Sequence, residues 1–364
     1  MSFYKILYRE FLNIVLIAFI CLAINWECDS SEFDNPHKSY SYNYKGQIHS
    51  HSKRSDGGQN AYDVIQAYKN AGYHFCFLTD HFDYNPPKLK QEEIPTGILY
   101  IPGDELDDPV TSTKHHILSL GIEMPKPKEF TDFKDILNTI YKFNTVAVLA
   151  HPGAKSGYTF EEISKKSIAD WYLGIEIYNA TCMPSSGWEP QWYINDYWEP
   201  LLKASLKKWC FSVDDCHNVI NNKGSFNRAW IVVNSQKGPL QDFLGAPEKQ
   251  KEIRDDIIKN IKTGNFYSVV RSPNINGDSP SLGTADLGPK LTVAVTEDKV
   301  IAATDLPSNI SFVCDGEIGG SFTNVTYAIY KSNGQESYVR VEIEQKRADG
   351  ETYRAYSQPL FRIK

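Results

Sequence analysis

Residues 46–56 read Gly-Gln-Ile-His-Ser-His-Ser-Lys-Arg-Ser-Asp, and two glycines follow them. His49 and His51 stand two positions apart at the end of a short strand-like run. Successive side chains of a strand alternate between its faces, so the two imidazoles are expected on one face. Asp56 adds a carboxylate a few residues beyond them. The stretch predicts half of a metal site, although a His-x-His pair taken alone also fits a solvated surface strand.

Further histidines and carboxylates stand where other predicted strands end. Apolar strand-like runs cover residues 74–78, 98–102, 145–150 and 208–213, and the run at 117–120 begins directly after a His-His pair. The runs are expected to bring together His49, His51, Asp56, His81, Glu105, His116, His151, Asp215 and His217. Only three of the nine histidines in the chain fall outside this set, so chance placement explains the pattern poorly.

The order of the predicted elements indicates the fold class. Helix-like patterns at 61–71, 133–143, 160–167 and 197–205 alternate with the strands. Such alternation is typical of an α/β domain with a parallel sheet, either open or closed into a barrel. In α/β barrels the chemistry gathers at the carboxyl ends of the strands, where these histidines and acids are predicted to lie.

The composition changes after residue 273. Glycines and prolines mark a linker at 276–289, and residues 290–364 alternate apolar and polar side chains between turns such as Ser332-Asn333-Gly334. This pattern predicts a small antiparallel β domain. It contains no histidine, since the last one in the chain is His217. We therefore expect it to support the site-bearing domain at 44–275 without supplying a metal ligand.

The first 28 residues carry a targeting pattern. Lys5 and Arg9 precede an apolar run at 14–24, which fits a signal peptide and is short for a bilayer span. The alternatives are a cleaved signal peptide and an uncleaved anchor, with a polar tether at 29–43. Both predict an exported protein that is periplasmic, extracellular or membrane-anchored and that contacts a membrane only through this segment.

Charge and cysteine content narrow the class of protein further. The net charge of −7 disfavours general nucleic-acid binding, which needs basic surfaces. The seven cysteines include no Cys-x-x-Cys pair, which disfavours a zinc ribbon. Five cysteines lie beyond the targeting segment, and an odd number does not imply a disulfide framework.

The order of the motifs resembles the PHP (polymerase and histidinol phosphatase) superfamily over residues 44–273. The motifs are His-x-His at 49–51, Ser-Asp-Gly at 55–57, Thr-Asp-His at 79–81, Gly-x-Glu at 103–105, Ala-His-Pro at 150–152 and Asp-x-His at 215–217. Residues 175–179, 214–218 and 263–267, with the tail segments 338–342 and 357–361, are similar to its CehA/McbA-like branch. Cys216 departs from the family's usual alanine, and Val213 from its glycine or serine.

The resemblance implies a distorted (β/α)7 barrel with a C-terminal β sandwich, and two or three divalent ions of zinc, manganese or iron. It implies three groups of ligands: His49, His51, Glu105 and Asp215; Glu105, His116 and His151, with Glu105 bridging; and Asp56, His81 and His217. The family spacing to Gly121 favours His116 over His115 as the ligand.

These features imply an exported metal-dependent hydrolase, most consistent with a phosphoesterase acting on a small anionic substrate. Two or three divalent ions would outweigh the three carboxylates of the predicted ligand set and attract anions. Such ions lower the pKa of bound water from about 15.7 to about 7, which provides a hydroxide nucleophile. One alternative is hydrolysis of carbamate, carboxylic ester or amide bonds, and another is a non-catalytic metal- or sugar-binding protein.

Four residues beside the predicted ligands are candidates for catalysis or support. Asp80 and Asp214 each precede a ligand and could orient an imidazole or donate a proton. His115 could support a ligand, face the substrate or be solvated. Glu176, on the predicted strand 173–178, is expected to support a ligand from outside the metal site.

Four further residues are candidates for substrate binding. Lys53 and Arg54 could bind a phosphate oxygen or be solvated loop charges. Tyr178 and Asn179 belong to a stretch, residues 171–198, that is rich in tryptophan and tyrosine. This stretch could line a substrate cleft or simply pack beneath a loop.

Overall fold

A computed structural model describes residues 31–84, 88–110, 115–125, 129–154, 157–182, 193–220, 225–272, 286–347 and 350–363. All of the predicted site residues fall within these ranges. The predicted targeting segment at 1–28 and most of the predicted linker at 276–289 lie outside them. Within the described ranges, no helix is long and apolar enough to cross a bilayer.

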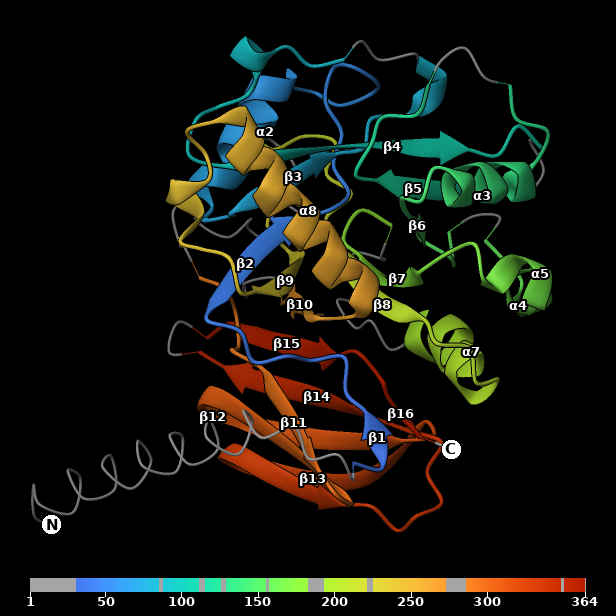
Figure 1. Ribbon diagram of the computed structural model, residues 1–364, viewed down its shortest axis with the longest axis vertical. Helices are drawn as coiled ribbons and strands as arrows, with labels where there is room; N and C mark the ends of the chain where they lie inside the picture. The colour runs from blue at the N-terminus through green and yellow to red at the C-terminus, as the bar shows by residue number, and fades with distance from the viewer. Residues whose placement is uncertain are drawn as a thin grey trace, which may run out of the picture.

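The first part of the chain alternates strands with helices (Figure 1). Its elements are β1 (Phe33–Asp34), β2 (Tyr42–Gln47), α2 (Ala61–Asn70), β3 (Phe75–Leu78), η1 (Phe82–Tyr84), η2 (Gln91–Glu93), β4 (Leu99–Asp107), β5 (His116–Leu120), α3 (Phe133–Lys142), β6 (Val146–Leu149), α4 (Phe160–Ser164), α5 (Lys166–Ala169), β7 (Gly174–Asn179), η3 (Ile194–Trp198), α7 (Glu199–Lys203) and β8 (Trp209–Val213).

The second part is mostly strand. Its elements are β9 (Ala229–Ser235), η4 (Leu240–Asp242), α8 (Pro247–Thr263), β10 (Phe266–Arg271), β11 (Thr292–Thr296), β12 (Lys299–Cys314), β13 (Glu317–Lys331), β14 (Tyr338–Lys346), β15 (Thr352–Ser357) and β16 (Leu360–Arg362). Residues 299–314 form one long strand, β12, whose pairing with β13 is interrupted by register shifts.

Strands β2 to β8 stand side by side in sequence order and close on themselves at one end. The Asp215 amide donates to the His49 carbonyl (3.0 Å), and the His51 amide donates to the Cys216 carbonyl (3.1 Å). These bonds join the segment after β8 to the segment after β2. The row of strands is therefore closed where the predicted ligands stand.

The prediction of a parallel sheet is correct for two blocks of strands and wrong between them. β2, β3 and β4 are parallel, and so are β6, β7 and β8, but β5 is antiparallel to both β4 and β6. The connection between β4 and β5 covers only residues 108–115. This is too short for the crossover that a parallel pair needs, so the chain turns back as a hairpin.

Helix α2 shows how the sequence sets an element that covers the strands. Val64, Ile65 and Tyr68 recur at helical spacing and are buried. The Asn60 side chain accepts a hydrogen bond from the Asp63 amide (2.9 Å) and caps the first turn. Gly72, at φ +79°, takes the left-handed conformation that follows the last turn.

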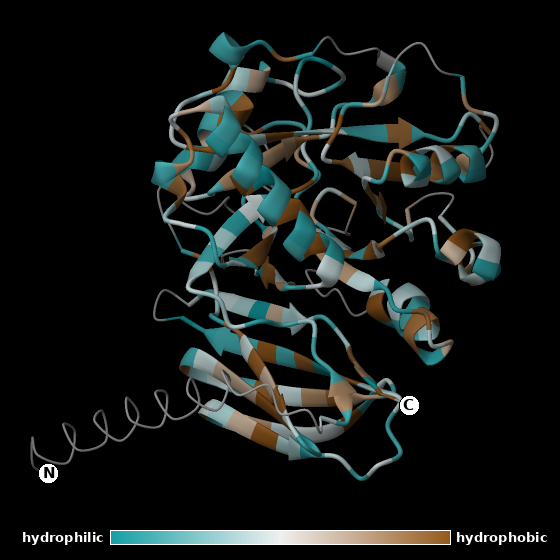
Figure 2. Cartoon of the chain, in the orientation of Figure 1, coloured by the Kyte–Doolittle hydropathy of each residue, from teal (hydrophilic) through white to brown (hydrophobic). Residues whose placement is uncertain are grey.

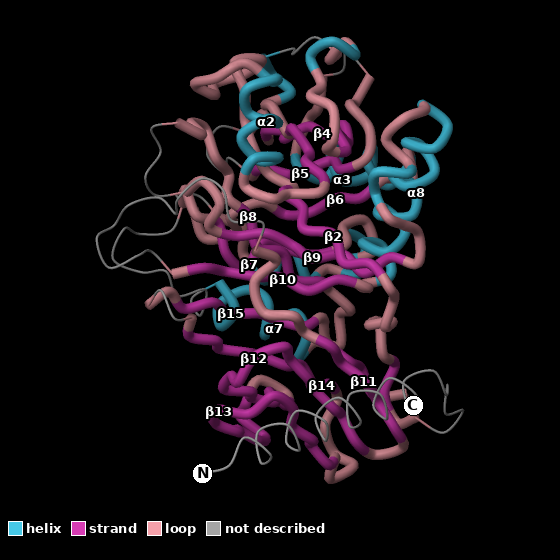
Figure 3. Tube along the Cα trace, turned by 90° about the vertical axis from the view of Figure 1, so that its left-hand side faces the viewer, coloured by secondary structure: helices cyan, strands magenta, loops and turns pink. Residues whose placement is uncertain are grey.

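Helix α8 is an element that sequence analysis did not predict. Only Ile253, Ile257 and Ile261 bury apolar side chains, and they form a single narrow stripe on an otherwise polar helix. The helix has Pro247 at its start and the left-handed Gly264 at its end, which are common helix boundaries. In Figure 3, α8 runs along one side of the stacked strands.

The core lies between the strands and the helices that flank them. β3, β6 and β8 are buried along their whole length, and the cartoon in Figure 2 is brown where hydrophobic residues occupy the strands. Strands buried on both faces show continuous apolar runs instead of alternation. This explains why these three strands were predictable as short apolar segments.

The C-terminal strands are antiparallel, as predicted, but they continue the sheet of the first part. β15 pairs with β10 from Tyr267↔Ser357 to Arg271↔Tyr353. Figure 3 shows the strands as one stack that runs through both parts. The Gln358 side chain adds hydrogen bonds to the backbone amide (2.8 Å) and carbonyl (3.1 Å) of Cys210 in β8. The predicted C-terminal β domain is thus joined to the first part by backbone pairing.

Candidate metal centre

The structure gathers histidine, aspartate and glutamate side chains into overlapping groups at the closed end of the strands. Among the described residues, five groups have ligand atoms within 4.8 Å of one another. They are His49, His51, Glu105 and Asp215; Glu105, His116 and His151; His51, Asp56, His81 and His217; His81, Asp107 and His116; and His151, Cys182 and Asp215. All nine ligands expected from the sequence are brought together here.

The first group has the spacing of a metal coordination shell. His49 Nε2 lies 3.1 Å from Glu105 Oε2 and 3.2 Å from Asp215 Oδ1. His51 Nε2 lies 3.1 Å from each of the same two oxygens. Ligand atoms at about 2.0–2.2 Å from a tetrahedral zinc ion would stand about 3.3–3.5 Å apart. The four atoms therefore fit around a single ion.

Burial favours a cation in this group. Its four side chains are buried, and His51 Nε2 and Asp215 Oδ1 make no hydrogen bond of normal geometry among the described residues, although the two atoms lie 3.1 Å apart. Buried polar atoms are normally hydrogen-bonded, and buried carboxylates without a compensating charge are costly. A divalent cation would satisfy both orphaned atoms and both carboxylates, so the residues present fit a metal ion.

The electrostatic field in the centre favours positive charge. Burial opposes protonation of His49, but Asp215, Glu105 and Glu176 outweigh it and hold the pKa of His49 well above its ordinary value. Burial likewise opposes ionisation of Glu105, yet the surrounding histidines hold its pKa well below the ordinary range. At His81, Glu105 and Asp107 overcome burial and raise the pKa to about 9. The same field would attract divalent cations.

Glu105 serves two groups with its two oxygens. Its Oε2 faces the first group, while its Oε1 lies 2.7 Å from His116 Nδ1 and 3.1 Å from His151 Nε2. This is the arrangement that the resemblance implies for a bridging carboxylate. Of the two adjacent histidines 115 and 116, only His116 has a ring nitrogen within 4 Å of Glu105.

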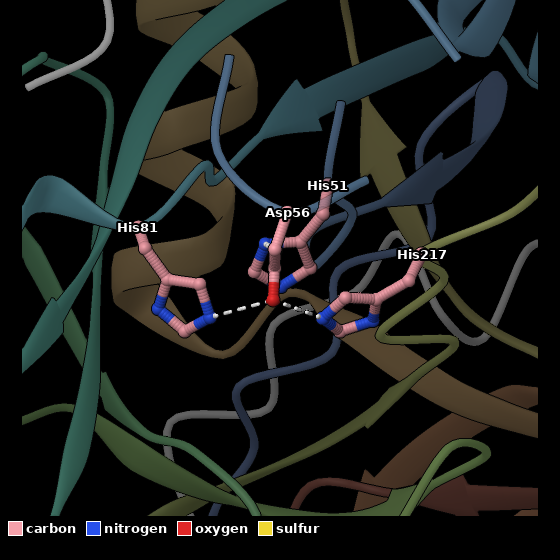
Figure 4. A group of neighbouring side chains, drawn as sticks. All are labelled: His51, Asp56, His81 and His217. Carbon is pink, nitrogen blue, oxygen red and sulfur yellow. Dashed lines mark ion pairs between the residues drawn. The ribbon is translucent and has the colours of Figure 1, made fainter. Parts of the chain in front are cut away.

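The third group gathers side chains around Asp56, and Figure 4 shows His81 and His217 on either side of its carboxylate. Asp56 Oδ2 lies 3.3 Å from His217 Nε2 and 3.6 Å from His81 Nε2. His51 also belongs to this group, because its Nδ1 lies 3.5 Å from Asp56 Oδ1. The side chains of Asp56 and His217 are 34% and 31% exposed, so this group faces solvent.

Two proposed ligands have strained backbones that their neighbours hold in place. His151 and Asp215 have φ values of +26° and +51°, which non-glycine residues rarely adopt. The His151 amide donates to Glu176 Oε2 (2.6 Å), and the Asp215 amide donates to the His49 carbonyl (3.0 Å). Such conformations persist where surrounding contacts fix them, often at functional sites.

Gly57 lets the loop of the third group turn back over the strand end. A side chain at this position would meet the carbonyl carbon of His51 at 2.6 Å, which is too close for any residue but glycine. The glycine of the predicted Ser-Asp-Gly motif thus allows Asp56 to come back towards His51.

Glu176 and Asn179, both on β7, support the ligands. Glu176 Oε1 lies 2.7 Å from His49 Nδ1, an orientation that leaves His49 Nε2 facing the metal group. The Asn179 amide donates to Glu176 Oε2 (2.9 Å) and Asp215 Oδ2 (3.1 Å). Its oxygen accepts the amides of Thr181 and Cys182. The predicted role of Glu176 fits these contacts, whereas Asn179 positions Asp215 and has its polar atoms engaged away from any substrate.

Asp80 and Arg54 organise the loop that carries Asp56. Asp80 accepts from the Ser52 amide (2.7 Å) and the Ser55 hydroxyl (2.9 Å), and its side chain is 1% exposed. Arg54 lies between Asp80 (3.3 Å) and Glu123 (2.8 Å). These contacts favour a structural role for both residues over proton donation by Asp80 or phosphate binding by Arg54. Lys53 is exposed on the same loop.

Asp214 and His115 turn away from the ligand groups. Asp214 accepts the amides of residues 227, 228 and 229, and burial raises its pKa to about 6. His115 stacks on Tyr158 with ring centroids 4.2 Å apart, and its Nδ1 lies 3.2 Å from Asp108. Both are therefore placed as packing and positioning residues instead of catalytic ones. Tyr178 is buried, and its burial raises its pKa to about 12.

Sequence analysis did not predict Asp107 or Cys182. Asp107 Oδ2 lies 3.1 Å from His81 Nδ1, and its Oδ1 lies 3.0 Å from His116 Nε2. Asp107 stands two positions after Glu105 on β4, so the two side chains lie on the same face of the strand. The predicted strand ended at Pro102, and extending it to Asp107 would have revealed this residue as a candidate. Cys182 Sγ lies 3.8 Å from Asp215 Oδ2. Burial is the main cause of a raised pKa for this thiol, and the nearby carboxylates raise that pKa further.

Comparison with known proteins finds similar solved structures. No protein-family model and no curated protein matches the chain. A two-domain protein of Bacteroides vulgatus containing a predicted PHP-like metal-dependent phosphoesterase is 16% identical, with a TM-score of 0.45, over 88% of this chain and 95% of that one. An amidohydrolase of Chromobacterium violaceum, with bound sulfate and no metal, is 15% identical, with a TM-score of 0.36, over 48% of this chain and 87% of that one.

A candidate metal-dependent phosphoesterase of Bifidobacterium adolescentis is 12% identical, with a TM-score of 0.37, over 59% of this chain and 96% of that one. The description of the first of these structures names a PHP-like metal-dependent phosphoesterase, and that of the third names a metal-dependent phosphoesterase. With all three TM-scores below 0.5, the function of this chain has to be inferred from its own site residues.

Proposed function

We propose that this protein is a metal-dependent phosphoesterase built on a distorted (β/α)7 barrel of the PHP superfamily. The observation that carries the proposal is Glu105, a buried carboxylate whose two oxygens each face a different group of ligands. Two-metal sites of this kind clamp the attacking and leaving oxygens of a displaced phosphoryl group. His51 extends the centre to a third group at the solvent-facing side.

The charge of the centre favours three ions for an anionic substrate. Five carboxylates belong to it or contact its ligands: Asp56, Glu105, Asp107, Asp215 and Glu176. Three divalent ions would exceed their charge by one unit, and two ions would fall short by one unit. We therefore propose that phosphate binding needs all three ligand groups to be filled. Zinc, manganese and iron all suit a mixed histidine and carboxylate set.

Bound ions would supply Lewis-acid activation of water and polarisation of the phosphoryl oxygens. The chain supplies fixed geometry: Glu176 orients His49, Asn179 orients Asp215, and Asp80 holds the loop of Asp56. Preorganised ligands avoid the cost of reordering during the reaction. The exposed edges of Asp56 and His217 provide the side from which a phosphate ester would enter.

Turnover of para-nitrophenyl phosphate, bis(para-nitrophenyl) phosphate and para-nitrophenyl acetate would test the proposal. Phosphate ester hydrolysis should disappear on chelation, return with Zn²⁺ or Mn²⁺, and be lost in Asp215→Asn. The exposed Asp170→Asn is the matched control and should keep activity. Hydrolysis of the acetate alone would replace the phosphoesterase proposal by an ester hydrolase. Full metal content without any turnover would indicate a binding protein.

We also propose that residues 1–28 direct export, on the strength of the basic residues and apolar run found there. Cell fractionation of the intact chain and of a chain that begins at residue 29 tests this. Equal distribution of the two would contradict export.

A further inference from the structure

A second cavity lies between α8 and the segment that leads into β4. It encloses about 440 Å³ and is lined by residues of the 91–100 segment, η4 and α8. This volume is within the range of small-molecule sites. None of the histidine or carboxylate ligands of the metal centre lines it.

Arg254 gives the lining of this cavity a positive charge. It is the one charged residue in the lining. Its Nε is buried and has no hydrogen-bond partner among the described residues. The two acids that follow it in the sequence contact other residues: Asp255 contacts Lys251 at 2.5 Å, and Asp256 accepts from the Ser235 hydroxyl at 2.6 Å. A half-buried guanidinium without a counter-ion is an incomplete site, because buried charges are normally paired.

The rest of the lining has an apolar part and a polar part. Ile94, Ile98 and Leu244 provide apolar surface. Gln250 reaches the same cavity, and its amide is fixed by a hydrogen bond to the Leu244 carbonyl (2.7 Å). This combination suits a ligand with a hydrocarbon body and one acidic end.

We propose that this cavity binds a small organic carboxylate, with the carboxylate paired to Arg254 and the body against Ile94, Ile98 and Leu244. Guanidinium and carboxylate match as paired planar groups, which gives two parallel hydrogen bonds. A single cation matches a single negative charge, and the lining contains no second cation for a phosphate dianion. The inference is independent of the proposed phosphoesterase activity.

Titration of the purified chain with benzoate, followed by calorimetry, tests this site. We expect binding by the wild-type chain, at least tenfold weaker binding by Arg254→Gln, and unchanged binding by Lys259→Gln, an exposed cation on the same helix. Benzyl alcohol, which lacks the charge, should bind at least tenfold more weakly than benzoate. The titration is repeated with chelator, because benzoate at Arg254 should not depend on metal ions.

Leu244→Glu provides a second variant if Arg254→Gln does not fold. It places a carboxylate in the cavity wall, where it should pair with Arg254 and abolish benzoate binding. Equal binding by wild type and Arg254→Gln, loss of binding on chelation, equal binding of benzyl alcohol, or no benzoate binding at all would each overturn the proposal.

Discussion

The Oε2 atom of Glu105 lies 3.1 Å from His51 Nε2, although β4 and the end of β2 belong to different parts of the sheet. Both side chains are buried, and the contact does not have the geometry of a normal hydrogen bond. This pairing joins the group that contains the bridging carboxylate to the solvent-facing group around Asp56. The predictions below follow from it and from the contacts around it.

Glu105→Gln should cost far more activity and bound metal than Glu176→Gln. Glu105 supplies one oxygen to each of two ligand groups, whereas Glu176 contacts the outer nitrogen of His49. Loss of an outer partner typically costs about 10–100-fold, and we expect a larger loss for Glu105→Gln. Elemental analysis and kcat/KM measure both effects, with the exposed Glu161→Gln as control. Equal losses of activity and metal in the two folded variants would contradict the proposed bridging role of Glu105.

Asp107→Asn should lower metal content, and Asp108→Asn should not. Asp107 contacts His81 and His116, two members of ligand groups, whereas the neighbouring Asp108 contacts His115 outside them. The expected cost of Asp107→Asn is about tenfold in metal affinity, as for other groups that orient ligands. Competition with a fluorescent chelator measures it. The same affinity in both variants would mean that Asp107 plays no part in the centre.

Arg54→Gln should reduce stability and leave the KM for a phosphate ester unchanged. The guanidinium neutralises Asp80 and Glu123, whose side chains are 1% and 12% exposed. Removing one partner from a buried ion pair costs about 3–5 kcal/mol of the free energy of unfolding. Chemical denaturation and steady-state kinetics test this, and Lys53→Gln on the exposed side of the loop should change neither quantity. A raised KM in a stable Arg54→Gln would restore the phosphate-binding role.

His37 should make the protein less stable in acid. Burial lowers its pKa from 6.5 to about 4, against the opposing effect of the Gln358 carbonyl. Since the folded state prefers the neutral ring, its contribution is complete above pH 6.5 and is lost as the pH falls towards 4. The shift corresponds to about 3 kcal/mol at most.

Denaturation of wild type and His37→Gln with chelator present, between pH 7 and pH 4.5, measures this contribution. The variant should start less stable and lose less stability over that range. His74, whose pKa burial also lowers to about 4, should leave part of the decline in the variant. Parallel curves for the two proteins would show that His37 is not responsible.

The clustering of the nine expected ligands could be predicted because these residues occupy strand ends in a recurring order. A strand that ends in a histidine or an acid places that side chain at one edge of a sheet, whatever the details of pairing. His49 and His51 illustrate this, since their rings lie side by side with centroids 5.2 Å apart. The residues that support the expected ligands were harder to predict. From the sequence alone, Asn179 fits a substrate-binding residue and Asp80 fits a proton donor, and only their hydrogen bonds show that they hold other side chains and loops in place.

Long-range pairing could not be predicted from local patterns. The reversal of β5 depends on the length of one connection, and α8 has too narrow an apolar stripe to stand out from a polar loop. The pairing of β15 with β10 depends on which edge of the sheet is left open, which no residue near Thr352 or Phe266 encodes by itself.

The pairing of β1 with β16 has a consequence for the order of folding. Phe33 pairs with Arg362, and the Arg362 guanidinium reaches Glu32 across 330 positions of sequence (2.6 Å). Contacts this distant along a chain carry a large loop-closure cost and form late. β1 therefore has no partner until almost every other strand has been synthesised and placed. The seam between β1 and β16 should therefore be among the last parts of the molecule to assemble.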